Sequence, residues 1–205
     1  EGLSTKITVQ EDWMKYIVKN KEIIRGWLEC KMIKYLQKRN PSVPGIADKL
    51  YPPQERKLDR IKKYWKMILS IEQVRDIYGG QILNEKDMSI DHFVPWSYVA
   101  HDEMWNLNPT TKSINSSKSN NLPEWDMYFE KLARQEYQSY RLMWKYDIIH
   151  DEFVKCAKEH INNDEIRERV YREGLDYAEL KSIILPVYQS AQNCGFGKWR
   201  WKGRK

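Results

Sequence analysis

The stretch SIDHFVPWSYVAHDEMWNLNPTTKSINSSKSNNLP, residues 89–123, decides the fold and carries the side chains with the clearest chemistry. It places Asp91 and His92 next to each other at the end of a short, β-prone run. After a turn-rich connection, Asn115 and Lys118 follow three residues apart. A carboxylate, an imidazole, an amide and an ammonium group in this order are the starting point for predicting what the chain does.

These residue types suit the hydrolysis of a phosphodiester. The Asp91 carboxylate and the Asn115 amide oxygen are hard ligands, which suit Mg²⁺, Ca²⁺ or Mn²⁺ rather than zinc. Neighbouring residues on a strand point to opposite faces, so the His92 ring is free to take a proton from water. Lys118 shares a face with Asn115 if the segment is helical. The stretch lacks the clustered carboxylates of a two-metal site, which favours one metal with one base.

The stretch resembles the HNH endonucleases, whose ββα-metal core carries a His at the end of the first strand. The pattern D-H-x-x-P, then W-N-L, then N-x-x-K-S-x-N-x-P is most similar to the HNH domain of CRISPR RNA-guided effectors and their relatives. The resemblance implies that Asp91 and Asn115 hold Mg²⁺ or Mn²⁺ and that His92 is the general base. It also implies that Asn106 holds the loop that orients His92. By the same resemblance, Lys118 faces the phosphate.

A second interpretation of the same residues stays open. An isolated Asp-His pair is usually a surface feature, and runs rich in Asn and Ser are usually solvated loops or helix caps. Degenerate HNH copies bind nucleic acid without cutting it. The hypotheses are therefore a metal-dependent HNH endonuclease that hydrolyses DNA, and a catalytically inactive HNH-fold module that binds nucleic acid or protein.

Composition indicates which partners and which cellular compartment suit the chain. The chain has 205 residues, a net charge of +6 and a pI near 9.0, which is consistent with a polyanionic partner such as DNA, with RNA left open. No apolar run approaches the roughly 18 residues of a membrane helix. Three widely spaced cysteines form no C-x-x-C pair, which argues against structural zinc and for a reducing, cytoplasmic setting. Many HNH proteins carry a Cys pair before the Asp-His, and residues 77–80 have none.

The predicted fold is α+β and mostly α-helical, with a ββα-metal core between two helical regions. The expected regions are residues 1–75, the nuclease core at 76–122, and a C-terminal helical region at 123–205. Apolar residues recurring at steps of three and four predict helices. Their expected ranges are 10–39 (divided near residue 20), 54–69, 124–146, 151–161, 164–173 and 177–193 (kinked or broken at Pro186).

Turn and capping residues predict a hairpin and the start of a helix in the ββα-metal core. Residues 81–83 and 88–93 are expected to pair as a hairpin through residues 84–87. Pro109 and the two threonines after it suit the start of the helix that delivers Asn115. His101, Asp102 and Glu103, in the connection, are expected to be solvated. The alternatives are that His101 is a third metal ligand, or that Asp102 or Glu103 reaches the metal through water.

The C-terminal end interleaves cations with aromatic rings. This pattern suits phosphate neutralisation with base stacking, or a partner interface, and its alternative is a basic tail with no special role. The predicted nucleic-acid contacts there are Lys198, Trp199, Arg200, Trp201 and Lys202. No sequence-reading module is visible, so targeting by a partner subunit or a fused domain is expected. Defence, restriction and mobile elements use HNH domains in this way.

Overall fold

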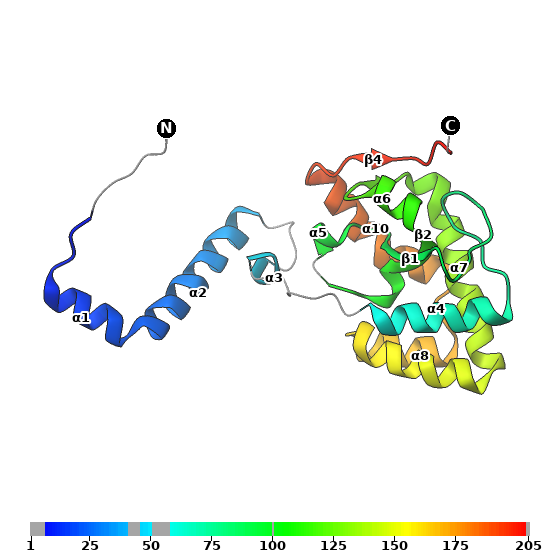
Figure 1. The fold of residues 1–205 in the computed structure, drawn as a ribbon, viewed down its shortest axis with the longest axis horizontal. Coiled ribbons are helices and arrows are strands. Elements are labelled where there is room, and N and C mark those ends of the chain that lie inside the picture. Colours follow the sequence, from blue (N-terminus) through cyan, green and yellow to red (C-terminus); the bar gives the residue numbers. More distant parts are fainter. Residues whose placement is uncertain (1–6, 41–45, 51–57, 100, 204–205) are drawn as a thin grey trace. The chain divides into compact units, whose positions relative to one another are not determined.

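The computed structural model describes residues 7–40, 46–50, 58–99 and 101–203, and divides the chain into two compact units, Glu1–Pro41 and Ser42–Lys205 (Figure 1). The first unit consists of helices α1 (Glu11–Lys19) and α2 (Lys21–Arg39), which separate at Asn20 as the periodicity predicted. In these two helices no residue is buried. Large apolar side chains such as Trp13, Trp27 and Leu28 are exposed.

The second unit contains every buried apolar residue that the structure describes. Its helices are α3 (Ile46–Leu50), α4 (Asp59–Ile71), α5 (Trp96–Val99), α6 (Lys112–Lys118), α7 (Trp125–Lys145), α8 (Asp147–His160), α9 (Asp164–Arg172) and α10 (Tyr177–Asn193). A short 3-10 turn covers Met104–Asn106. Residues 54–57, where a helix was expected to start, lie outside the described residues. The α10 helix continues through Pro186, so the break that was one of the two expectations there is absent.

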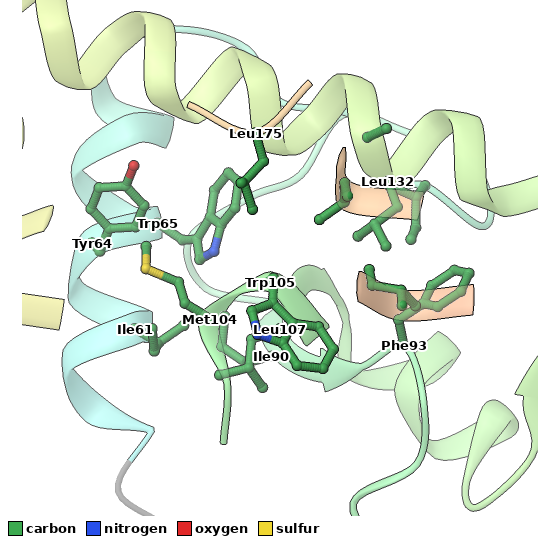
Figure 2. Close-up of a cluster of buried hydrophobic side chains, with 14 of the residues drawn as sticks. Ile61, Tyr64, Trp65, Ile90, Phe93, Met104, Trp105, Leu107, Leu132 and Leu175 are labelled. Carbon is green, nitrogen blue, oxygen red and sulfur yellow. The ribbon is translucent and has the colours of Figure 1, made fainter. Parts of the chain in front are cut away.

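The core lies between the long helices and a small sheet. Helix α4 packs against α8, and α7 packs against α8 and α10. Figure 2 shows Tyr64 and Trp65 from α4, Ile90 and Leu107 from the strands, and Leu132 from α7 gathered in one cluster. The predicted class, α+β and mostly helical, is confirmed.

The sheet pairs different segments from those expected. Strand β1 (Met88–His92) runs antiparallel to β2 (Leu107–Thr111), with His92 opposite Leu107. The predicted hairpin between residues 81–83 and 88–93 is wrong, and Ile82 instead forms an isolated bridge with Arg75. Residues 84–87 turn so that the Met88 amide bonds back to the Asn84 carbonyl, which delivers β1 to β2. Strand β1, whose alternating side chains place Ile90 in the core, therefore pairs with a strand that is distant in the sequence.

The start of α6 also differs from the prediction. Pro109 lies within β2, where a residue without an amide hydrogen is tolerated because each strand of a two-stranded sheet is an edge. The helix begins at Lys112, and the hydroxyl of Thr111 caps it by accepting a hydrogen bond from the Ile114 amide at 3.3 Å. A second, parallel pair joins β3 (Leu122–Pro123) to β4 (Lys198–Trp199).

Candidate active site

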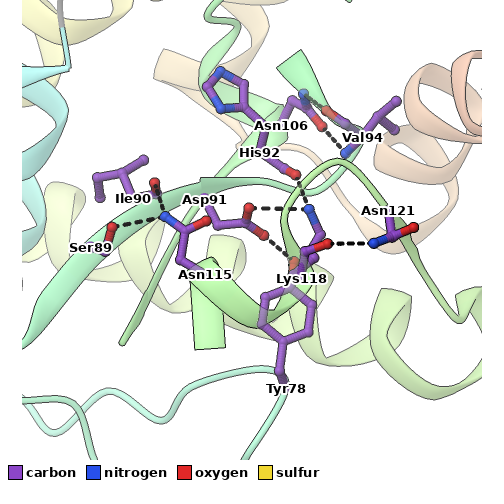
Figure 3. Close-up of polar contacts among 10 residues, drawn as sticks. All are labelled: Tyr78, Ser89, Ile90, Asp91, His92, Val94, Asn106, Asn115, Lys118 and Asn121. Carbon is purple, nitrogen blue, oxygen red and sulfur yellow. Dashed lines mark hydrogen bonds and ion pairs between the residues drawn. The ribbon is translucent and has the colours of Figure 1, made fainter. Parts of the chain in front are cut away.

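Strand β1 carries Asp91 and His92, and the pleat turns their side chains to opposite faces (Figure 3). The Asp91 carboxylate is only 4 % exposed and accepts two hydrogen bonds. The Tyr78 hydroxyl donates to Oδ2 at 2.6 Å, and the Lys118 ammonium donates to Oδ1 at 3.1 Å. Burial, helped by the Asp91 charge, raises the pKa of Tyr78 well above its ordinary value, so the phenol remains a donor.

Lys118 lies at the end of α6 and has no exposed surface. Its ammonium also donates to the His92 carbonyl at 2.7 Å. Burial lowers the pKa of Lys118, and the Asp91 carboxylate opposes that shift. A fully buried side chain does not fit the expectation that Lys118 faces the phosphate, because its charge is already committed inside the protein. A buried ammonium without a partner would be costly, and Asp91 is that partner.

Asn115 lies on α6 beside the start of the strand pair. Its amide nitrogen donates to the Ser89 hydroxyl at 2.8 Å and to the Ile90 carbonyl at 3.0 Å. These two bonds fix the amide plane, and Figure 3 shows its oxygen on the side of the Asp91 carboxylate. The structure therefore brings together the two side chains that were expected to hold a metal.

The His92 ring lies on the other face, where it contacts the connection between β1 and β2. His92 Nε2 lies 2.6 Å from an Asp102 carboxylate oxygen, and the ring is buried. The Asp102 carbonyl in turn lies 2.8 Å from His160 Nδ1, which ties the connection to the end of α8. Asp102 was expected to be solvated, and it instead holds His92.

Asn106 closes the loop that follows β1. Its side chain is completely buried, accepts from the Val94 amide at 2.7 Å and donates to the Val94 carbonyl at 2.9 Å. The Phe93 amide donates to the Asn106 carbonyl at 2.8 Å. These bonds fix the backbone directly after His92, in the loop that Asn106 was expected to hold.

The C-terminal segment packs over the same region. The Trp199 ring lies edge-on to Tyr78, with centroids 5.3 Å apart, and its indole nitrogen lies 3.3 Å from the Ser117 hydroxyl. The Trp201 amide donates to the Tyr128 hydroxyl at 2.9 Å. The predicted cations beside these rings, Lys198, Arg200 and Lys202, are exposed. Trp199 thus contacts the tyrosine that holds Asp91.

Comparison with known families agrees with this geometry. A family model described as HNH endonuclease matches residues 75–124, the segment that contains β1, β2 and α6. Residues 75–124 are an HNH endonuclease domain. No curated protein and no solved structure matches the chain in the corresponding comparisons. Unit 1 and helices α7 to α10 lie outside the family match.

The HNH domain offers a small set of oxygen ligands for a divalent cation. Each Asp91 oxygen accepts one hydrogen bond and keeps further acceptor capacity, and the bonds to the Asn115 nitrogen leave its oxygen for a metal. Among the described residues, no three His, Cys, Asp or Glu side chains group as a metal site. One carboxylate and one amide oxygen fit a cation that keeps several of its waters, as Mg²⁺ does.

The organisation around the HNH domain differs in detail from the three expected regions. The boundary between the two compact units falls at residues 41 and 42, inside the predicted N-terminal region of 1–75. The predicted core (76–122) and C-terminal region (123–205) lie in the same unit, joined by β3 and β4. None of the described helices combines the length and apolar composition that a bilayer crossing requires.

Proposed function

We propose that the HNH domain hydrolyses DNA phosphodiester bonds, with Asp91 and Asn115 holding one Mg²⁺ or Mn²⁺ ion and His92 acting as the general base. One observation carries the proposal: the two oxygen ligands converge on one face of β1, and His92 turns to the other face onto Asp102. When bound, the cation would stabilise negative charge on the phosphate and on the leaving oxygen.

The bond to Asp102 assigns the two nitrogens of His92. A carboxylate only accepts, so Nε2 carries the hydrogen and Nδ1 carries the lone pair that takes a proton from water. The imidazolium that forms is then stabilised by the Asp102 charge. Asn106 keeps the backbone beside the ring in place through Val94. This is a positioning role, and it requires no contact between Asn106 and the substrate.

Lys118 acts in this proposal through Asp91. Together with Tyr78 it holds the carboxylate in one orientation, and its charge balances that of Asp91 while no cation is bound. A preset ligand loses less freedom when the metal binds. Lys118 therefore contributes to the metal site as the charge partner of Asp91, in place of the phosphate contact expected from the sequence.

Substrate and setting complete the proposal. DNA is the proposed substrate, with RNA as the alternative. Its support is that Lys198, Arg200 and Lys202 are exposed and neighbour Trp199, which contacts the Tyr78 ring beside Asp91. The three free cysteines suit a cytoplasmic setting. The exposed apolar residues of unit 1 support targeting by a partner subunit, in a defence, restriction or mobile element.

One observation favours the alternative, an HNH-shaped module that binds nucleic acid or protein without cutting. Both carboxylate oxygens of Asp91 are already hydrogen-bonded, so Lys118 occupies part of the space around a metal ligand. If Lys118 holds that position permanently, the site binds no cation. The two functions therefore differ in whether Mg²⁺ reaches Asp91.

The test compares the parent protein with Asp91→Ala, and with Asp151→Ala as a control at an exposed carboxylate. Mn²⁺ binding followed by electron paramagnetic resonance should show one site in the parent and in the control, and none in Asp91→Ala. Nicking of supercoiled plasmid with Mg²⁺ should follow the same order, while DNA affinity changes little. Binding of Mn²⁺ and nicking at parent levels by Asp91→Ala would refute the proposed site.

A further inference from the structure

A groove beside the HNH helix α6 has no role in the proposed chemistry. Its volume is about 370 Å³, and its lining includes Ile82, Asn84, Asp87, Ser113 and Trp201. Ser113 lies on α6, the helix that carries Asn115, but two residues before it, so Ser113 and Asn115 point to different faces of the helix. This volume falls within the range of small-ligand sites.

Two of the lining side chains form apolar walls suited to a flat ring. Ile82 is 48 % exposed and lines the groove together with Trp201. Trp201 is half-buried and fixed, because its amide donates to Tyr128 and its ring contacts Trp199 with centroids 6.2 Å apart. An indole that is already held in place loses little entropy when a second ring stacks on it.

The rim of the groove is polar and selective. Asp87 contributes a carboxylate, and its carbonyl accepts from the Lys112 amide at 3.0 Å, which holds this turn against α6. Acidic side chains accept hydrogen bonds from the exocyclic amino groups of bases. Asn84 adds an amide, whose oxygen already accepts from the Lys86 amide at 2.9 Å. The rim therefore favours a base that carries an amino group over thymine.

Three lysines and one glutamate, Glu85, neighbour the groove-lining residues in the sequence. Lys86, Lys112 and Lys202 are exposed, and Lys112 Nζ donates to the Lys86 carbonyl at 3.1 Å. Asp87 precedes Asp91 by four residues, about 13 Å along a strand. A stacked nucleic-acid strand covers that distance in roughly four nucleotides. A strand cut at Asp91 could therefore place a nearby base at the groove.

We propose that this groove is a nucleobase subsite that takes one unpaired base of the substrate strand, stacked on Trp201 a few nucleotides from the cleaved phosphate. The proposal rests on the proposed function, since it needs a nucleic-acid strand at the HNH site. It separates the two C-terminal tryptophans: Trp199 supports Tyr78, and Trp201 contacts the substrate. It also predicts a preference for single-stranded or locally unpaired DNA, because a paired base cannot enter.

The experiment measures binding without cleavage, using the His92→Ala protein and single-stranded oligonucleotides. Each oligonucleotide carries one 2-aminopurine, moved along the strand position by position. We expect strong fluorescence quenching at one position only, and its loss in Trp201→Ala, with single-strand affinity lowered about 5- to 100-fold. Trp201→Phe should restore much of both. Trp144→Ala, at a more exposed tryptophan on α7, should change neither.

Surface variants guard against a folding defect in Trp201→Ala. Ile82→Ala should weaken quenching at the same position, and Ile148→Ala, an exposed isoleucine on α8, should not. Asp87→Ala should reduce the preference for cytosine over thymine at that position. Equal quenching at all positions, or equal affinities for Trp201→Ala and Trp144→Ala, would overturn the subsite. The Asp91 test does not depend on this result, so either proposal can fail alone.

Discussion

The Asp91 carboxylate meets two donors of different kinds, a neutral phenol and a buried ammonium. Tyr78→Phe removes the phenol hydroxyl and keeps the ring that packs against Trp199. Outer partners of metal ligands typically contribute about 10- to 100-fold to affinity, so we expect Mn²⁺ affinity to fall by about tenfold or more. Titration calorimetry measures this fall, with Tyr137→Phe, at an exposed tyrosine on α7, as the control. Unchanged affinity in Tyr78→Phe would contradict the positioning role.

At the residue scale, the motif located the positions of the proposed site but not all the contacts there. Asp91, Asn115 and Asn106 lie where their spacing in the motif placed them. The burial of Lys118 could not be predicted, since a lysine at the end of a polar helix is ordinarily exposed. Asp102 lies in a polar connection and gave no signal that it reaches the His92 ring.

Strand β4 illustrates the element scale, because it joins the C-terminal end to the HNH domain. Removal of residues 198–205 deletes the pairing with β3 and the Trp199 ring on Tyr78. We expect a lower melting temperature and weaker Mn²⁺ binding, measured by calorimetry.

A control for this truncation replaces Lys198, Arg200 and Lys202 with Gln and keeps both tryptophans. It should preserve metal affinity and flatten the dependence of log DNA affinity on log salt, by about 0.9 for each phosphate that the variant no longer neutralises. Truncation that left metal affinity unchanged would mean that β4 does not support the site.

Helix α7 contains a buried acid whose titration should affect stability. Burial raises the pKa of Glu136 from 4.5 to about 8. The folded state therefore holds this proton more tightly than the unfolded state, and the stability that results is full below pH 4.5 and is lost as pH rises to about 8.

Glu136→Gln stays neutral throughout this range. We expect the parent to lose about 2–5 kcal/mol of unfolding free energy relative to the variant between pH 5 and pH 9. Urea unfolding at both pH values measures the difference. Parallel pH profiles for the two proteins would show that Glu136 ionises normally in the folded state.

At this scale, amphipathic helices were predictable because their apolar period appears in each segment separately. Strand pairing was not, because the register depends on a partner far along the chain. The turn at residues 84–87 suggested a local hairpin, but β1 pairs with β2 beyond residue 106. Ile90 and Leu107 are both buried in the core, and neither residue alone reveals which segment its strand pairs with.

For the whole molecule, sequence and structure agree on an HNH domain inside a largely helical chain. The division between residues 41 and 42 falls between the helices expected at 10–39 and 54–69, but the sequence analysis placed both helices in one region, 1–75. Composition likewise could not show that α1 and α2 bury no residue of their own. The proposed cleavage of nucleic acid is assigned to the HNH domain at residues 75–124 and is tested on the 205-residue chain.

The most direct measurement is the nicking of supercoiled plasmid by the 205-residue chain with Mg²⁺, by the same chain with EDTA, and by His92→Ala. His150→Ala, at an exposed histidine on α8, is the matched control. General-base catalysis contributes about 10²- to 10⁴-fold, so His92→Ala should nick at least about 100-fold more slowly than the parent. The parent and His150→Ala should nick at equal rates with Mg²⁺ and should be inactive with EDTA. Equal nicking by the parent and His92→Ala would contradict catalysis at the HNH site.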